Sequence, residues 1–216
     1  MRGALIPMKD LRGAKGRLAD ALGADQRAAL AAAMFRDVVQ ACRASGLFDV
    51  IAVVSRDSEV FWQARELGAV AIAEPATLNG LNDSLRFGQR YLARRVGVDE
   101  LLILPADIPL VTPQALRAVC DALGGASRAV AIAPARDGGT NALAIRPAEA
   151  IGMRFGVDSA RAHAAAARSV GIEPAEVLVP ALAFDVDAPE HLAELAREQC
   201  GSATRAWFDE WRTGQN

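Results

Sequence analysis

Short apolar runs alternate along the chain with longer stretches in which apolar residues recur at helical spacing. A continuous apolar run is typical of a strand buried on both faces of a parallel sheet. Such runs predict strands at residues 3–7, 50–54, 69–73, 101–104, 129–133, 141–145 and 177–179. Because these strands alternate with helices, we expect an α/β fold in a single domain of three layers, with a mainly parallel, mixed sheet.

The strand predicted at 141–145 departs from the parallel order. It follows the strand at 129–133 after the sequence Asp137-Gly138-Gly139. Asp and Gly strongly favour tight turns. The short connection predicts that 141–145 is either a hairpin partner or an antiparallel edge of the sheet.

Several helix starts are indicated by capping chemistry. Thr112 followed by Pro113 is typical of an N-cap and a first helical residue. Asp25 is expected to cap the first long helix, and Asn82 or Asp83 to cap the helix after the third strand. Such helix starts would point backbone N–H groups at the carboxyl edge of the sheet, where open α/β sheets bind ligands.

Asp107 stands out at that edge. It lies in the stretch LLILPADIPLVTP, after the apolar run 101–104 and between Pro105 and Pro109. A proline cannot donate to a sheet ladder, so Pro105 marks the end of the strand and places Asp107 in the loop just beyond it. A carboxylate there is suited to binding a ligand or metal, although a loop Asp that only forms turn hydrogen bonds has the same spacing.

Composition narrows the class of protein. No uncharged apolar run approaches the roughly 18 residues needed to span a bilayer. The three cysteines lack CxxC spacing, which suits reduced thiols and a cytoplasmic location, and two histidines make a zinc site improbable. A net charge of −2 without a basic cluster argues against nucleic-acid binding. We therefore expect a cytoplasmic enzyme or binding protein that acts on small molecules.

Lysine is concentrated in one loop. The chain has 22 Arg but only two Lys, Lys9 and Lys15, and both follow the first predicted strand together with Arg12 and Arg17. Two glycines in this loop allow close backbone approach to a ligand, and the cations complement phosphate. The loop matches neither the dinucleotide-binding nor the P-loop pattern. It is either a phosphate-binding loop or an ordinary basic surface loop.

More polar groups are predicted at the same edge of the sheet. They are Asn82, Thr140, Gly156, Ser159 and Asp187. Side chains alternate along an extended chain, so only one of Asp185 and Asp187 is expected to share the orientation of Asp107. Gly156 before Ser159 is consistent with an anion site at a helix start, but the spacing by itself favours an ordinary N-cap. Carboxylates, cations and backbone N–H groups together suit a magnesium-bound nucleoside triphosphate, hence phosphoryl or nucleotidyl transfer.

Six motifs, in order from about residue 3 to about residue 195, carry a family resemblance. They are ALIPMKDLRGAKGRL, GLN at 80–82, LPADIPL, DGGTN, RFGVDS and FDVDAPEHL. Together they resemble the guanylyltransferases of coenzyme F-420 biosynthesis. This resemblance implies a fold like that of nucleotide-diphospho-sugar transferases, and transfer of GMP from GTP to phosphoenolpyruvate, 3-phospho-D-glycerate or 2-phospho-L-lactate with release of pyrophosphate. Phosphoenolpyruvate is favoured, with 3-phospho-D-glycerate also above phospholactate, because an Arg- and Ala-rich composition suggests a bacterium.

The resemblance also implies roles for individual residues. The basic catalytic loop that handles the triphosphate corresponds to Lys9, Lys15 and Arg17. Asn82 matches a position near the nucleotide, and Asp107 and Asp187 match the carboxylates that hold magnesium. The residues that bind the phosphorylated acid correspond to Thr140, Gly156 and Ser159. Gly16 departs from the pattern, since relatives often carry Ser or Thr there.

Other interpretations stay open at the level of sequence. Asp185-Val186-Asp187 could be the metal-binding motif of a glycosyltransferase, or the chain could bind a nucleotide without turnover. We assign residues 1–200 to the nucleotidyltransferase domain and 201–216 to a tail whose Trp207, Phe208 and Trp211 pack on the body or on another subunit. A downstream transferase is an expected partner if the product is unstable. The sequence leaves the oligomeric state and the residue that reads guanine undetermined.

Overall fold

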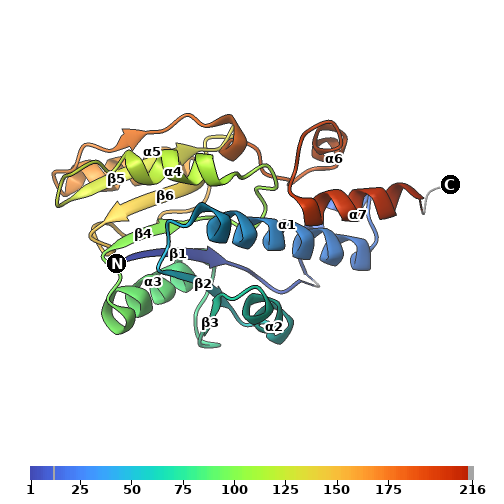
Figure 1. Ribbon diagram of the computed structural model, residues 1–216, viewed down its shortest axis with the longest axis horizontal. Helices are drawn as coiled ribbons and strands as arrows, with labels where there is room; N and C mark the ends of the chain where they lie inside the picture. The colour runs from blue at the N-terminus through green and yellow to red at the C-terminus, as the bar shows by residue number, and fades with distance from the viewer. Residues whose placement is uncertain (12, 214–216) are drawn as a thin grey trace.

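A seven-stranded mixed sheet forms the centre of the computed structural model, which describes residues 1–11 and 13–213 (Figure 1). The strand order is β3-β2-β1-β4-β6-β5-β7. The strands are β1 (Arg2–Pro7), β2 (Val50–Ser55), β3 (Val70–Ala73), β4 (Glu100–Ile103), β5 (Ala129–Pro134), β6 (Thr140–Arg146) and β7 (Ala175–Glu176). β1 pairs in parallel with both β2 and β4, so the loops that follow β1 and β4 leave the sheet side by side.

Helices cover both faces of the sheet. They are α1 (Ala24–Ser45), α2 (Ser58–Glu66), α3 (Leu81–Tyr91), α4 (Pro113–Asp121), α5 (Ser159–Ser169), α6 (Pro189–Leu195) and α7 (Ser202–Thr213), with short turns η1 (Gly16–Leu18), η2 (Leu92–Val96) and η3 (Pro180–Leu182). Apolar residues of α1, α2 and α4 pack on one face, and those of α3 and α5 pack on the other. The result is the predicted three-layer arrangement.

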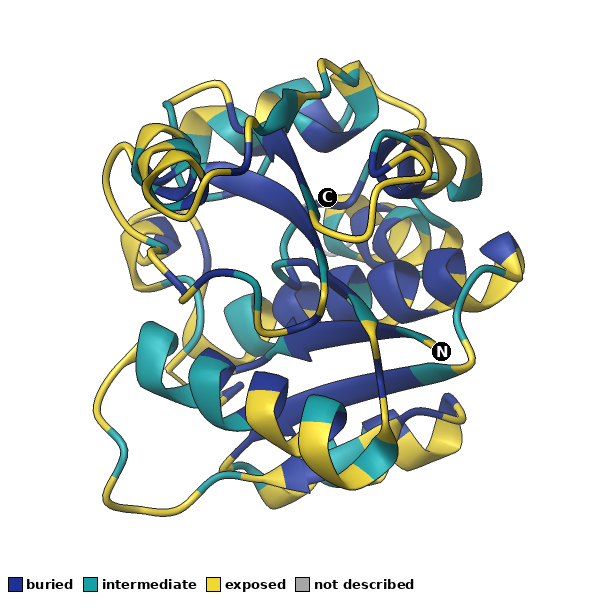
Figure 2. Cartoon of the chain, turned by 90° about the vertical axis from the view of Figure 1, so that its left-hand side faces the viewer, coloured by how far each residue is buried: buried dark blue, intermediate teal, exposed yellow. Residues whose placement is uncertain are grey.

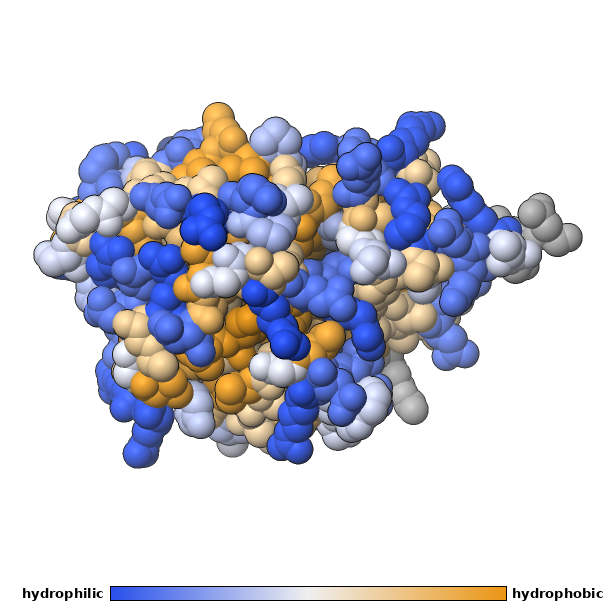
Figure 3. Space-filling model, viewed as in Figure 1, coloured by the Kyte–Doolittle hydropathy of each residue, from blue (hydrophilic) through white to orange (hydrophobic). Residues whose placement is uncertain are grey.

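Burial follows these layers. The inner strands are almost wholly buried, the edge strands β3 and β7 are partly exposed, and the helices bury one side and expose the other (Figure 2). Hydrophilic side chains predominate on the face that carries α1 and α4, with apolar side chains between them near its centre (Figure 3). This pattern is expected for amphipathic helices that cover a sheet. Among the described residues, no helix is long and apolar enough to cross a membrane.

The antiparallel strand lies inside the sheet. β6 is the hairpin partner of β5, as one of the two predicted arrangements required, but it also pairs with β4. The prediction of an edge strand is therefore wrong. β6 is buried along almost its whole length, because it fills the space between β4 and β5. A hairpin whose second strand inserts between two others cannot be recognised from local spacing alone.

The last strand begins earlier than predicted. β7 covers Ala175 and Glu176 rather than residues 177–179. The backbone N–H of Val177 still donates to the carbonyl of Ile132 at 2.8 Å, but Pro180 then starts η3 and ends the pairing. Val177 and Val179 pack against the core without forming a strand, while Leu178 is exposed.

Two predicted helix caps are also wrong. Gly23 caps α1 and Gly80, with φ at 87°, caps α3, so Asp25, Asn82 and Asp83 lie in the first turn of their helices. Asp and Asn are common both at the N-cap and in the first turn of a helix, so the sequence alone did not show which of the two positions each residue occupies.

The predicted cap of α4 is confirmed. The Thr112 side chain accepts a hydrogen bond from the N–H of Ala115, with Pro113 at the first helical position. This cap turns the chain back onto the sheet directly after the Asp107 loop.

Helix α7, in the C-terminal tail, packs along α1 (Figure 1). Trp207 and Phe208 are buried in a cluster that includes Leu30 and Met34. The carboxylate of Asp37, which is 5% exposed, accepts hydrogen bonds from the backbone N–H groups of residues 203 and 204 at 2.9 and 2.8 Å. A buried carboxylate of α1 thus caps the start of α7 and fixes it to the body.

Candidate active site

Lys15 joins two carboxylates at the carboxyl edge of the sheet. Its Nζ lies 2.5 Å from Oδ2 of Asp107 and 2.9 Å from Oδ1 of Asp187. Arg17 reaches the other oxygen of Asp187 at 3.8 Å from the opposite, exposed side. Four of the residues proposed from the sequence therefore meet in one ion-pair network. Arg12, from the same basic loop, lies outside the described residues.

The backbone of Lys15 is strained. Its φ of 54° and ψ of 42° place it in the left-handed region, which costs a residue with a side chain about 1–2 kcal/mol. The side chain is only 9% exposed, so the loop buries an ammonium between two acids. Strain retained at such a position is a common feature of functional sites.

The charges in this network stabilise one another. Burial disfavours the ammonium, but the attraction of Asp107 and Asp187 outweighs it and raises the pKa of Lys15. Burial acts against the Asp187 carboxylate in the same way, yet Lys15, with help from Arg17, lowers the pKa of Asp187 below its usual value. Lys15 and Asp187 are therefore both charged at neutral pH.

Two loops that are far apart in the sequence are tied together here. The N–H of Val186 donates to the carbonyl of Asp107 at 3.2 Å, which joins the loop after β4 to the segment before α6. The N–H of Asp187 donates to Nδ1 of His191 at 3.1 Å. These backbone contacts set the positions of the two carboxylates independently of Lys15.

Asp185 is a third acid near this network. Burial raises its pKa, and the negative charge of Asp107 raises it further, so the two groups are close. Asn141 donates to Oδ1 of Asp185 at 3.3 Å. The sequence analysis expected only one acid of the Asp185–Asp187 pair to face Asp107. Strict alternation does not hold here, because this segment is irregular and belongs to no strand.

A bulge places Asn141 toward Asp185. In the β5–β6 ladder, Ala133 pairs with Ala142 and Pro134 pairs with Thr140, so Asn141 is an extra residue. A bulge of this kind redirects a side chain and is frequent next to active sites. The register shift sits directly after the Gly-Gly turn, which is the sequence signal that could have indicated it.

Thr140 and Ser159 meet in a second, buried cluster. Ser159 Oγ lies 3.0 Å from Thr140 Oγ1, which also lies 3.1 Å from Nδ1 of His163. All three residues are at most 5% exposed. His163, which the sequence did not single out, therefore contacts one of the residues proposed to bind the acceptor and is linked through it to another.

The tautomer of His163 follows from its partners. The backbone N–H of Arg154 donates to Nε2 at 2.9 Å, so Nε2 carries no proton. Burial lowers the pKa of His163 to about 4, so the ring is neutral and carries its proton on Nδ1. This proton is donated toward Thr140. Of the two hydroxyl protons, one joins Thr140 to Ser159, and the other is not used between these two side chains.

Asn82 and Gly156 are linked through Phe155. The Asn82 side chain both donates to the carbonyl and accepts from the N–H of Phe155, each at 2.8 Å. Gly156 has φ at 143°, a conformation that residues with side chains rarely adopt. The first turn of α3 thus holds the segment that leads into Ser159 and α5.

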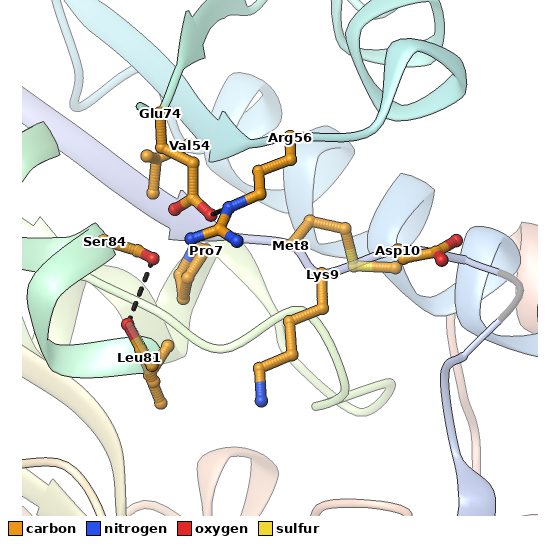
Figure 4. Close-up of a pocket in the computed structure, with 10 residues that line it drawn as sticks. Pro7, Met8, Lys9, Asp10, Val54, Arg56, Glu74, Leu81 and Ser84 are labelled. Carbon is orange, nitrogen blue, oxygen red and sulfur yellow. Dashed lines mark hydrogen bonds and ion pairs between the residues drawn. The ribbon is translucent and has the colours of Figure 1, made fainter. Parts of the chain in front are cut away.

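Two cavities meet at Lys9. One, of about 440 Å³, is lined by Lys9, Lys15, Arg17, Asp107 and Asp187 among others. The second, of about 290 Å³, shares with it the wall formed by residues 7–9 and Leu81. Figure 4 shows the second pocket, in which the side chain of Lys9 extends away from the paired side chains of Arg56 and Glu74. A charged cavity and a largely apolar pocket are therefore adjacent.

Comparison with known proteins identifies the family. A family model described as "Guanylyl transferase CofC like" matches residues 2–212. The chain belongs to this guanylyl transferase family. The match includes most of α7, so it extends beyond the end of the motifs recognised in the sequence.

Individual relatives agree with this assignment. A phosphoenolpyruvate guanylyltransferase of Sphaerobacter thermophilus is 42% identical over 194 residues, with 89% of this chain and 91% of the relative covered. A 3-phospho-D-glycerate guanylyltransferase of Phenylobacterium zucineum is 34% identical over 206 residues, with 94% of each chain covered. The chain is thus a nucleotidyltransferase enzyme, which argues against the glycosyltransferase and binding-module interpretations.

A solved structure supports the predicted fold. A crystal structure from Desulfovibrio desulfuricans G20, assigned provisionally as a nucleotide-diphospho-sugar transferase, superposes with a TM-score of 0.77 at 19% identity. It covers 97% of this chain and 94% of its own. The nucleotide-diphospho-sugar transferase-like fold is therefore confirmed, while this distant likeness indicates nothing about substrates.

The donor set of the site suits a divalent cation. The Lys15 ammonium, itself a cation, lies within 3 Å of oxygens from both Asp107 and Asp187. Among the described residues, no group of three or more His, Cys, Asp or Glu side chains is arranged to hold a metal alone. Two carboxylates with further ligands from phosphates and water are typical of magnesium in nucleotide-processing enzymes. The residues present therefore fit a divalent cation that arrives with a nucleotide.

Proposed function

We propose that the protein transfers GMP from GTP to a small phosphorylated three-carbon acid and releases pyrophosphate, in coenzyme F-420 biosynthesis. Phosphoenolpyruvate is the favoured acceptor, because the relative at 42% identity is an enzyme named for it. The observation that carries the proposal is the ion-pair network of Lys15, Asp107 and Asp187, which lines a cavity together with Lys9. This is the charge pattern expected around a metal-bound triphosphate.

The proposed roles divide between the two clusters. Lys9, Lys15 and Arg17 neutralise the triphosphate, and Asn82 lies where the nucleotide and acceptor subsites adjoin. Asp107 and Asp187 would hold magnesium, which when bound neutralises charge on the phosphates. The acceptor is held by Thr140, Gly156 and Ser159, where the spare hydroxyl proton and the helix start of α5 favour an anion.

The chemistry requires no general base. An oxygen of the acceptor's phosphate bonds to the α-phosphorus of GTP, and the bond from that phosphorus to the bridging oxygen of pyrophosphate breaks. The attacking phosphate is already ionised near neutral pH, so no side chain must remove a proton. Catalysis then depends on positioning and on charge neutralisation by the basic loop.

Pyrophosphate release tests this proposal. The protein is supplied with GTP and magnesium, and phosphoenolpyruvate, 3-phospho-D-glycerate and 2-phospho-L-lactate are tested in separate reactions. A downstream transferase is included as a coupling partner to consume an unstable product. Release with one acceptor is expected. Absence of release with all three acceptors, from folded protein, would contradict the proposal.

A further inference from the structure

We propose that Glu74 reads the guanine base, in the pocket that adjoins the charged cavity. This inference rests on the proposed function, since it takes GTP as the nucleotide. The pocket has a volume of about 290 Å³ and lies between the end of β1, the end of β2 and the start of α3. The pocket shares a wall with the cavity of Lys15. One nucleotide could therefore place its base in the pocket and its triphosphate in the cavity.

The walls of the pocket suit a flat aromatic ring. Pro7, Met8, Val54 and Leu81 supply apolar surface. Gly80, which has φ at 87° and open space within 4 Å of where a Cβ would lie, leaves one side of the pocket open. Binding sites of this kind are mostly apolar, and a few placed polar groups select the ligand.

Glu74 is the acid that we expect to select the base. The Glu74 side chain is only 9% exposed, and one of its oxygens is paired with Nε of Arg56 at 2.5 Å. Arg56 also donates to the carbonyl of Leu78, which connects the pair to the loop between β3 and α3. In Figure 4, the Glu74 carboxylate and the Arg56 guanidinium lie together at one end of the pocket. Arg56 is therefore a positioning residue for the carboxylate.

Hydrogen-bond chemistry indicates which base fits. A carboxylate only accepts hydrogen bonds, and its two oxygens match two adjacent donors. Guanine presents such a pair, N1–H and the 2-amino group, whereas adenine and cytosine place an acceptor beside their amino group, and uracil flanks its N3–H with two carbonyls. The N–H groups of Arg56 that remain unused complement the O6 acceptor of guanine. Glu74 would therefore distinguish GTP from the other nucleotides.

The test compares GTP with two analogues. Inosine triphosphate lacks the 2-amino group, and xanthosine triphosphate replaces it with a carbonyl. We expect the wild-type protein to prefer GTP over inosine triphosphate by about 10- to 100-fold, the range for a hydrogen bond to a charged group. In Glu74→Gln this preference should approach unity, and use of xanthosine triphosphate should increase, because the amide can donate to the new carbonyl. Glu74→Asp, which keeps the carboxylate, should retain the preference for GTP even if its overall affinity falls.

Controls separate this inference from the proposed function. Glu173→Gln makes the same chemical change in an exposed ion pair with Arg168, and it should leave all three nucleotides unaffected. Affinities are measured without acceptor, by competition against a fluorescent GTP analogue, and rates are measured with acceptor. Discrimination in binding without GMP transfer would contradict the proposed function and leave the assignment of Glu74 intact. GMP transfer with an unchanged ratio of GTP to inosine triphosphate in Glu74→Gln would overturn the assignment.

Discussion

Removal of the Lys15 charge should separate GTP use from acceptor use. In Lys15→Met, the chain keeps a side chain of similar length, but Asp107 and Asp187 lose the ammonium that lies 2.5 and 2.9 Å from their oxygens. Loss of one preorganised charge at a reacting phosphate costs about 10²- to 10³-fold in rate. We expect kcat/KM for GTP to fall by that amount, while KM for the acceptor changes by less than about threefold.

The stability of this variant should change little. The ammonium is buried at a cost, and its attraction to two partly exposed carboxylates, 30% and 43% exposed, offsets that cost. We therefore expect the free energy of unfolding to stay within about 1 kcal/mol of wild type. Because Lys15 lowers the pKa of Asp187, that pKa should rise in the variant.

Initial rates of pyrophosphate release provide the assay. GTP is varied at saturating acceptor, and the acceptor is then varied at saturating GTP. Arg94→Met serves as the matched control, since it removes an exposed cation from an ion pair with Glu149. Equal losses for GTP and acceptor, or a rate near that of wild type, would refute the role given to Lys15.

Three further predictions concern other parts of the molecule. Asp107→Asn should abolish turnover and leave the fold intact, as judged by circular dichroism and melting temperature, and a rate near normal would remove Asp107 from the site. Asp37→Asn should lower the free energy of unfolding by about 1–2 kcal/mol and leave kcat unchanged, because the cap of α7 loses its charge. Asp209→Asn, on the exposed side of α7, is the control. Equal stability of the two variants would contradict the capping role of Asp37. The neutral His163 has a pKa of about 4 in the folded protein against an ordinary value of 6.5, so the unfolded chain binds more protons between these values. The stability that this group contributes is present above pH 6.5 and is lost as pH falls toward 4, by about 3 kcal/mol in total. Urea unfolding across this range should show that loss in wild type and lack it in His163→Phe, and parallel pH profiles would contradict the buried neutral ring.

The parallel half of the fold was predictable from local pattern. Uninterrupted apolar runs identified β1, β2, β3 and β4, and Thr112 with Pro113 identified the start of α4. These features depend on residues that are adjacent in the sequence. The interior position of β6 was not predictable in this way, because it depends on which strand pairs with the side of β4 that does not face β1.

The site was predictable to a similar extent. Both lysines of the chain lie in the loop after β1, which indicated Lys15, and the proline-flanked loop after β4 indicated Asp107. Their ion pair follows from the parallel pairing of β1 with β4, which brings the two loops together. Which of Asp185 and Asp187 faces Asp107 was not predictable, because this irregular segment does not follow strand alternation. His163 was missed because its partners, Thr140 and the backbone of Arg154, come from two other segments. Contacts of this kind are set by tertiary packing and have no local signature.

A double-label experiment tests the central claim most directly. GTP labelled with ³²P at the α-phosphate and ¹⁴C-labelled phosphoenolpyruvate are mixed with the protein and magnesium, quenched rapidly and separated by chromatography. The account predicts one new species that carries both labels, formed together with pyrophosphate and lost in Asp107→Asn. Pyrophosphate release that leaves the ³²P in free GMP, with the ¹⁴C still in unchanged phosphoenolpyruvate, would contradict transfer to this acceptor.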